Sequence, residues 1–257
     1  MSDSEFIELS NYIKTQFGID LTKKRILIEG RLSHELHKRG ISTFKEYLNV
    51  VFNDKTGAEV TLLLNKLTTN LSYFMRENEH FDYLQNQVLP FFEKTKGSTR
   101  DLRIWSAGCS TGQEPYNIAM VIDEYFGSKK NRWDTTILAT DISMKVLTAA
   151  QQGIYAEEDL KDISPSWKNK YFEKTSTGEV KVCDRIRNEV VFKPFNLMEP
   201  FRFKKPFDLI FCRNVMIYFD ADTKATLVKK FFDFTSDGGF LFIGHSESIN
   251  NQKQHYA

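Results

Sequence analysis

Residues Ile104–Tyr116 read IWSAGCSTGQEPY, an apolar segment followed by a glycine-containing turn and the start of a helix. The apolar residues predict a strand, and Gly108 and Gly112 place two glycines among small residues in the turn. Pro115 is expected at the first helical position, because its fixed φ already suits a helix. A strand, a glycine turn and a helix in this order let a ligand approach the backbone at the positive end of the helix dipole. This stretch therefore predicts an open α/β sheet with a nucleotide-like cofactor at its edge.

The glycine turn alone leaves an ordinary strand-to-helix connection open, because the G-x-G-x-x-G pattern of dinucleotide sites is absent. A second predicted strand, residues 136–140, leads into Asp141. An acidic side chain at that place can accept two hydrogen bonds from a ribose diol. The alternative is that Asp141 only caps a helix, or that Ser143 begins the helix instead. The combination with the glycine turn favours ribose binding by Asp141.

The composition describes a soluble protein. The 257 residues carry a net charge of only +1, so no general attraction to nucleic acid or to a membrane surface follows. Three cysteines at unrelated spacings argue against a disulfide framework or a zinc site. The amino-terminal residues MSDSEFIEL lack the basic and apolar regions of a signal peptide, and no apolar run approaches the roughly 18–20 residues that span a bilayer. We expect a cytoplasmic monomer that binds no nucleic acid and inserts in no membrane.

Residues 1–75 contain helical patterns and no convincing strand. Apolar residues recur at helical spacing, and glycines at 18 and 40 mark two helix ends. The expected helices are about 6–17, about 22–39, one beginning near 42, and about 58–67. This segment predicts a small all-α domain.

The second of these helices is strongly basic. Only Glu29 and Glu35 oppose its positive residues, which are Lys23, Lys24, Arg25, Arg31, Lys38 and Arg39. One interpretation is an ordinary solvated face, and the other is a docking surface for an acidic partner. Both stay open from the sequence.

From Leu102 onward, predicted strands and helices alternate, which is typical of a mainly parallel sheet with helices on both faces. Further strands are expected at 189–192, 207–212 and 240–244, with helices at 144–152 and 221–234. An insert contains a predicted hairpin at 171–186. Polar residues follow the carboxyl ends of the strands, where such sheets bind ligands. These residues are Glu114, Asp141, Asn196, Arg213 and Asn214.

Four blocks together resemble the bacterial chemotaxis receptor glutamate methyltransferases, a family that depends on S-adenosylmethionine. They are TTNLSYFMRENEHF (Thr68–Phe81), WSAGCSTGQEPY (Trp105–Tyr116), FDLIFCRNVMIYFD (Phe207–Asp220) and GGFLFIGHSES (Gly238–Ser248). The resemblance implies a Rossmann-like class I methyltransferase domain over 76–257, with a small antiparallel β insert at about 164–188. An all-α receptor-docking domain and linker over 1–75 would precede it. Members usually continue with one more strand beyond the place where this sequence ends.

The resemblance also implies the reaction and the residues that serve it. The methyl group of S-adenosylmethionine would pass to glutamate side chains of chemotaxis receptors, leaving S-adenosylhomocysteine. Asp141 would hold the ribose, Asn196 and Leu197 the adenine, and Glu114 the cationic or hydroxyl groups of the donor. Cofactor contacts are expected at Asn70, Ser72, Arg76, Gly108, Glu114, Asp141, Asn196, Leu197, Arg213 and Asn214.

Little acid–base machinery is needed, because a glutamate carboxylate with an unperturbed pKa near 4.3 is already ionised at neutral pH. We expect Arg76 to orient the carboxylate or the donor, and Tyr218 to place its hydroxyl near the methyl group. The alternatives are a domain-linking ion pair for Arg76 and a buried aromatic role for Tyr218. His245 and Glu247 are expected to be structural. The five histidines show no metal-ligand spacing, so no metal is expected.

Two other functions stay open at this point. One is a methyltransferase of the same fold for a small carboxylic acid, although a small substrate needs no basic docking face. The other is a sensor that binds S-adenosylmethionine and a receptor without methyl transfer. The presence of Arg76 and Tyr218 argues against the sensor.

Overall fold

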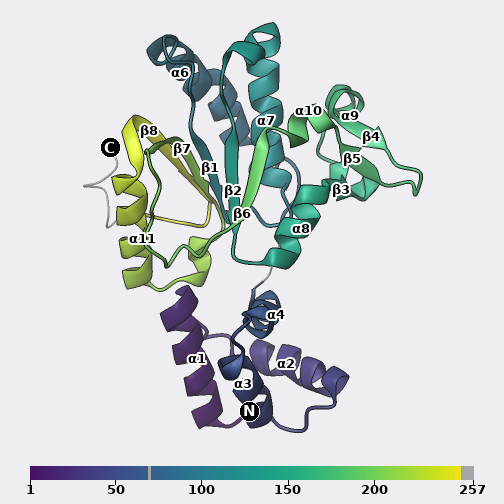
Figure 1. The fold of residues 1–257 in the computed structure, drawn as a ribbon, viewed down its shortest axis with the longest axis vertical. Coiled ribbons are helices and arrows are strands. Elements are labelled where there is room, and N and C mark those ends of the chain that lie inside the picture. Colours follow the sequence, from purple (N-terminus) through teal and green to yellow (C-terminus); the bar gives the residue numbers. More distant parts are fainter. Residues whose placement is uncertain (69–70, 250–257) are drawn as a thin grey trace.

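A computed structural model describes residues 1–68 and 71–249 of the chain (Figure 1). The four helices expected near the amino terminus are present and pack as a separate group below the sheet. Glycines at 18 and 40 end the first two in the left-handed conformation, as the sequence predicted. The helices are α1 (Asp3–Phe17), α2 (Arg25–Arg39), α3 (Phe44–Asn53) and α4 (Ala58–Leu67).

The rest of the chain is built on a five-stranded sheet in which every neighbouring pair is parallel. The strand order is β6-β2-β1-β7-β8, which confirms the predicted open α/β sheet. The strands are β1 (Ile104–Ala107), β2 (Ile137–Asp141), β6 (Val190–Pro194), β7 (Phe207–Cys212) and β8 (Thr235–Ile243). The longer helices beside them are α7 (Gln113–Phe126), α8 (Met144–Gln152) and α11 (Ala221–Asp233).

Two local predictions were wrong, and one helical run was not predicted. Strand β8 begins at Thr235 rather than at 240, because a β-bulge opposite Phe207 carries Gly238 (φ 72°) within the strand. Pro115 is the third residue of α7 rather than the first, where its missing N–H is still one of the unpaired donors of the first turn. The sequence analysis also missed a helical run of α5 (Glu79–Tyr83), a π-helical turn (Leu84–Val88) and α6 (Leu89–Thr95).

The insert contains the predicted hairpin, with one strand more than expected. Strands β4 (Phe172–Lys174) and β5 (Val180–Val182) form the hairpin, and β3 (Ile154–Tyr155) pairs with the other side of β5. Short helices α9 (Pro165–Tyr171) and α10 (Asp184–Arg187) flank it. Shorter turns of 3-10 helix lie at Gly127–Arg132, Glu157–Leu160 and Met216–Tyr218.

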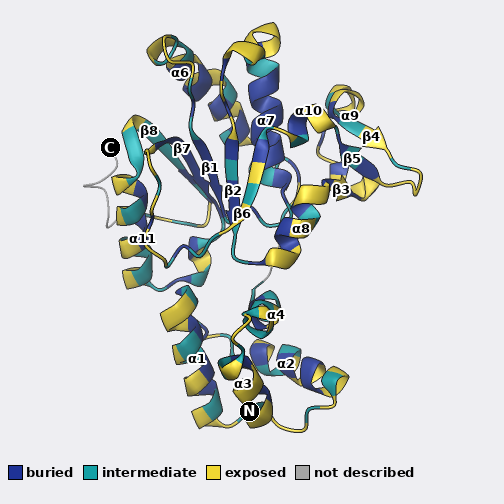
Figure 2. Ribbon diagram, in the orientation of Figure 1, coloured by how far each residue is buried: buried dark blue, intermediate teal, exposed yellow. Residues whose placement is uncertain are grey.

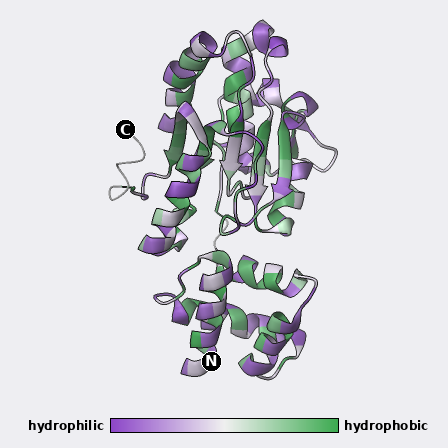
Figure 3. Cartoon of the chain, turned by 60° about the vertical axis from the view of Figure 1, so that its left-hand side comes forward, coloured by the Kyte–Doolittle hydropathy of each residue, from purple (hydrophilic) through white to green (hydrophobic). Residues whose placement is uncertain are grey.

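Apolar residues on the two faces of the sheet belong to two separate cores. Ile104 and Phe211 point into one core, which α5, α6 and α7 cover. Trp105 and Ile210 point into the other, which α11 and the amino-terminal helices share. The buried central strands and the exposed outer faces of α11 are visible in Figure 2, and Figure 3 shows the same contrast in hydropathy. The second core therefore joins the helical domain to the sheet.

Within residues 1–68 and 71–249, no helix combines the length and the apolar character that crossing a bilayer requires.

Trp105 is the centre of the second core. It is fully buried, and its indole Nε1–H donates to the Thr140 hydroxyl at 2.9 Å. Its ring lies 4.9–5.8 Å, centroid to centroid, from a shell of aromatic rings. These belong to Phe195, Phe201, Phe203, Phe207 and Phe231. Such edge-on aromatic packing adds to the free energy of burying the rings.

Trp105→Ala is expected to lower the free energy of unfolding by about 3–5 kcal/mol, because it leaves a large cavity among the aromatic rings that surround Trp105. Ile26→Ala is the control, since Ile26 is 88% exposed, and it should change stability by less than about 0.5 kcal/mol. Urea unfolding of both variants measures the effect. A loss below about 1 kcal/mol for Trp105→Ala would contradict the tight packing of aromatic rings around Trp105.

Candidate functional site

A pocket opens at the carboxyl edge of the sheet, where it meets the helical domain. Phe17, Ile19 and Leu64 line it from the amino-terminal part, and β1, β2 and β7 reach it with their carboxyl ends. The predicted site residues that line it are Ser72, Arg76, Gly108, Glu114, Asp141, Asn196, Leu197, Arg213, Asn214 and Tyr218. Asn70, also predicted, lies outside the described residues. The fold thus brings ten of these positions, from distant parts of the sequence, to one place.

At the glycine turn, the backbone of Gly108 is closely approached by the Val215 side chain. Gly108 has a φ of 89°, and a Cβ built on it would lie 2.4 Å from the Val215 side chain. Its N–H donates to the Thr140 carbonyl oxygen at 2.8 Å, which ties the turn to the neighbouring strand. No residue with a side chain fits this position without displacing Val215.

Asp141 lies at the end of β2 with both carboxylate oxygens directed by backbone donors. Oδ2 accepts from the Ser110 N–H and Oδ1 from the Ser143 N–H, each at 2.9 Å. Burial raises the pKa of Asp141, while these hydrogen bonds act in the opposite direction. The carboxylate is therefore fixed at the pocket wall before any ligand arrives.

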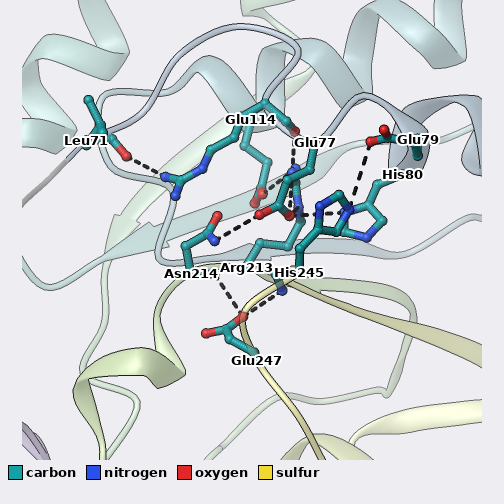
Figure 4. Close-up of polar contacts among 11 residues, drawn as sticks. Leu71, Glu77, Glu79, His80, Glu114, Arg213, Asn214, His245 and Glu247 are labelled. Atoms are coloured by element: carbon teal, nitrogen blue, oxygen red, sulfur yellow. Dashed lines mark hydrogen bonds and ion pairs between the residues drawn. The ribbon is translucent and has the colours of Figure 1, made fainter.

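The Arg213 guanidinium is buried between two carboxylates (Figure 4). Only 2% of its side chain is exposed. It lies 3.2 Å from Glu114 Oε2 and 3.2 Å from Glu77 Oε2, and it also donates to the Arg76 carbonyl oxygen. Glu114 accepts a further bond from the Ser106 hydroxyl at 2.7 Å, and burial raises its pKa. With both acids ionised, two negative charges face one positive charge, which suits a cationic ligand group.

Asn214 and Glu247 fix the loop that follows β7. Asn214 has a φ of 58°, and its side chain donates to Glu77 Oε1 at 3.0 Å. Glu247 accepts from the backbone N–H groups of Asn214 (2.9 Å), Ile217 (3.2 Å) and Gly244 (2.6 Å). These bonds agree with the structural role predicted for Glu247.

The fold places Glu77, His80 and His245 with ligand atoms within 4.8 Å of one another, a grouping that sequence spacing did not predict. Burial is the main cause that lowers the pKa of His80 to about 4. Both Glu77 oxygens already accept bonds, one from Arg213 and the other from Asn214. A metal ion here would compete with the buried guanidinium for the same carboxylate. The group is better described as a support for the Arg213 loop.

The two predicted adenine residues are engaged inside the protein. Asn196 donates through Nδ2 to the Gln16 carbonyl oxygen of α1 at 2.8 Å, and its Oδ1 accepts from the Met198 N–H. The Leu197 side chain is buried, and its carbonyl oxygen accepts from Lys230 Nζ at 3.1 Å. Asn196 therefore links the pocket to the helical domain.

Arg76 and Tyr218 occupy the pocket wall with different partners. Arg76 donates to the Leu71 carbonyl oxygen at 2.7 Å, and its guanidinium lies 5.7 Å from the Tyr73 ring centre. Across the described residues it forms no ion pair with an acidic side chain, so the domain-linking ion pair is not seen. The Tyr218 ring is half-buried, with Lys24 Nζ 4.6 Å from its centre.

Sequence reasoning missed Glu77, Ser106 and Asn117. Glu77 is part of the quoted block 68–81, and the signal for it was charge balance, since a buried arginine needs acidic partners. Ser106 and Asn117 carried no signal, because a small polar residue in an apolar run has many structural uses. All three become recognisable only from their surroundings.

The parallel sheet, the glycine turn and the acidic residue at the end of β2 define an α/β protein that binds a nucleotide-like cofactor at its carboxyl edge. The family description "CheR methyltransferase, SAM binding domain" matches residues 70–257, and "CheR methyltransferase, all-alpha domain" matches residues 4–68. The chain belongs to the CheR methyltransferase family. It is therefore an S-adenosylmethionine-dependent methyltransferase.

Curated relatives match along nearly their whole length. The chemotaxis protein methyltransferase of Borreliella burgdorferi is 44% identical over 96% of this chain and 89% of that protein. The probable chemotaxis protein methyltransferase of Rhizobium etli is 38% identical, over 95% and 92%. That of Escherichia coli K12 is 36% identical, over 100% and 88%. A solved glycopeptide N-methyltransferase matches 59% of this chain and 48% of its own at 14% identity, with a TM-score of 0.34, too low to add to the argument.

The lowered pKa of His80 predicts a pH-dependent stability. Between its ordinary pKa of 6.5 and about 4, the unfolded chain binds a proton that the folded chain does not, so stability is lost as pH falls through this window. His80→Phe keeps a ring against Phe242 but removes the titration. From about pH 7.5 to about pH 5, wild type should lose about 2 kcal/mol more than this variant.

Urea unfolding at the two pH values measures this difference. His34→Phe is the control, because His34 is exposed on α2, and it should keep the wild-type pH dependence. Equal losses for wild type and His80→Phe would contradict the burial of a neutral imidazole at this position.

Proposed function

We propose that this chain transfers the methyl group of S-adenosylmethionine to glutamate side-chain carboxylates of chemotaxis receptors, giving methyl esters. The observation that carries the proposal is the pocket that brings Asp141 and the Glu114–Arg213 pair together with Arg76 and Tyr218 on its wall. The names of the full-length relatives support a chemotaxis substrate. Base-labile label on receptor-bearing membranes, after incubation with methyl-labelled cofactor, would support it. Label on a small carboxylic acid alone, or none, would overturn it.

The pocket residues fit the parts of the cofactor. We assign Asp141 to the ribose hydroxyls, because its carboxylate is fixed by two backbone donors and faces the pocket. Glu114 and Arg213 are assigned to the methionine end, whose ammonium and carboxylate groups match an acid–arginine pair. Asn196 and Leu197 are assigned to the adenine end. Ser72 and Gly108 complete the wall.

Bound S-adenosylmethionine supplies a methyl group already activated on a positively charged sulfur. The chain then has to place an ionised glutamate in line with that methyl group and exclude water, which is worth up to about 7–11 kcal/mol in favourable cases. Arg76 is the residue proposed to orient the incoming carboxylate, because its guanidinium has no acidic partner among the described residues. Tyr218 is proposed to direct its hydroxyl toward the transfer site.

Asp141→Asn is expected to weaken S-adenosylhomocysteine binding by about 1.5–3 kcal/mol, because the ribose loses a charged acceptor. The matched control is Asp134→Asn, which precedes the same strand and accepts from Thr136 as Asp141 does from Ser143. Calorimetry should show wild-type affinity for the control. Wild-type affinity for Asp141→Asn as well would remove Asp141 from the site.

Arg76→Lys and Tyr218→Phe should slow single-turnover methyl transfer at least tenfold, a cost of about 1.4 kcal/mol, while changing cofactor affinity much less. Both residues are proposed to act at the transferring group rather than on the cofactor. Tyr73→Phe is the control, since its hydroxyl has no assigned role. If binding and rate fall in parallel, the two residues hold the cofactor instead.

The basic helix of the helical domain is a second part of the proposal, with residues 1–75 as the receptor-docking domain. Three of its arginines have partners inside that domain. Arg25 pairs with Asp3 and Glu29, Arg39 with Glu35 and Glu59, and Arg31 donates to the Lys66 carbonyl oxygen. Lys23 and Lys38 are exposed, and the exposed apolar Ile26 and Leu27 lie between them in the sequence.

Charge reversal of Lys23 and Lys38 to glutamate should raise the KM for receptor without changing cofactor affinity. Association should also weaken as salt rises past about 0.15 M, where the Debye length is roughly 8 Å. Lys205→Glu, on the far part of the α/β domain, is the control. If the rate of receptor methylation depends on neither the salt concentration nor these charge reversals, the basic residues form an ordinary solvated surface and not a docking surface.

A further inference from the structure

Asn117 is a fully buried side chain with no hydrogen-bond partner. It lies in α7, its exposed fraction is 0%, and it lines the pocket. Across the described residues, neither Nδ2 nor Oδ1 finds a donor or an acceptor. Buried polar groups are nearly always paired, and an unpaired one lowers stability. An amide with both ends unpaired needs an explanation outside the folded chain itself.

The neighbours of Asn117 show that the helix itself does not require this polarity. Tyr116 is equally buried, but its hydroxyl donates to the Ala150 carbonyl oxygen at 2.6 Å. Glu114, one turn earlier, pairs with Arg213 and Ser106. The following residues, 118–122, are apolar and buried. An apolar residue at 117 would suit the fold better than an amide does.

Asn117 lies near the end of the pocket that contains Glu114 and Arg213. Residues three apart on a helix lie on the same face, so Asn117 follows Glu114 along the wall that faces Arg213. Asp141, the residue assigned to the ribose, comes instead from the end of β2, where it accepts from the Ser110 N–H of the glycine turn. An amide carries one acceptor and two donors. It can therefore accept from an ammonium group and donate to a carboxylate.

We propose that Asn117 binds the amino-acid end of S-adenosylmethionine, where an ammonium and a carboxylate group lie on one carbon atom. The assignment rests on the cofactor orientation proposed above, with the ribose at Asp141 and the methionine end at Glu114. Asn117 is then a cofactor-binding residue whose hydrogen bonds are completed only when the pocket is filled. The unpaired amide lowers the free energy of unfolding of the free protein, and its hydrogen bonds to the cofactor increase the binding affinity.

Two ligands distinguish binding of the amino-acid end of the cofactor from binding of its nucleoside end. S-Adenosylhomocysteine keeps the amino-acid end, whereas 5′-methylthioadenosine has the same nucleoside and thioether without it. Calorimetry on Asn117→Leu should show a loss of about 10- to 100-fold in affinity for the first, as expected for hydrogen bonds to charged groups, and no change for the second. Asp141→Asn should weaken both ligands, because both contain the ribose.

Thermal unfolding of the free protein gives a second readout. Asn117→Leu removes two unpaired polar atoms, so its Tm without ligand should rise by about 2–4 °C. The matched control is Tyr47→Phe, since the Tyr47 hydroxyl is also buried and unpaired but lies in the helical domain. It should raise the Tm similarly and leave both ligand affinities unchanged.

Three outcomes overturn the proposal. Wild-type affinity of Asn117→Leu for S-adenosylhomocysteine would show that the amide does not touch the amino-acid end. Equal losses for both ligands, or a loss together with a lower Tm, would show that Asn117 supports the fold, for example through a buried water molecule. If leucine prevents folding, Asn117→Ala is tested with the same two ligands, and their affinities alone decide. Failure of wild type to bind S-adenosylhomocysteine would instead overturn the cofactor assignment itself.

Discussion

The buried guanidinium of Arg213 sets the arrangement of everything around it. A charge removed from water must be compensated by nearby opposite charges and hydrogen bonds, because an uncompensated one is strongly destabilising. Arg213 meets this requirement with Glu114 from α7, Glu77 from the interdomain segment and the Arg76 carbonyl oxygen. These contacts join the interdomain segment at Arg76 and Glu77, helix α7 and the end of β7. One wall of the pocket, formed by Glu114, Arg213 and Asn214, is therefore fixed by the contacts that neutralise one arginine.

Backbone strain is concentrated in the same region. Of the five non-glycine residues with positive φ in the described chain, four belong to segments that form the pocket. They are Met75, Glu77, Ser110 and Asn214. Such conformations cost of order 1–3 kcal/mol each and persist only where the surroundings impose them. For Glu77 and Asn214 the surroundings are the Arg213 contacts and the backbone bonds to Glu247, and the Ser110 N–H is held by Asp141. The site is held in place rather than assembled by flexible loops.

Much of the fold could be predicted from local patterns. Helical spacing located α1 to α4, alternation of elements predicted the parallel sheet, and the glycine turn and Asp141 both line the pocket that the structure contains. Prediction failed where distant residues decide. Glu77 binds Asn214, which lies 137 positions further along the chain, and no local spacing reports such a pair. Likewise, β8 begins early because of a bulge against Phe207, and the arginines of α2 are neutralised by partners from α1 and α4.

Asn196 donates to the Gln16 carbonyl oxygen at the end of α1 while it also lines the pocket. The Asn196 side chain thus contacts both the pocket at the edge of the sheet and the helical domain. Linkage between two binding equilibria is reciprocal, so if a ligand in the pocket competes for the Asn196 amide, a change at the end of α1 also changes the affinity of the pocket. Other polar contacts join the two domains beside this bond, since the Ser143 hydroxyl donates to Asn65 at 2.6 Å and Lys14 pairs with Asp220 at 2.6 Å. A ligand that displaces Asn196 from Gln16 would therefore act on the end of α1 as well as on the pocket.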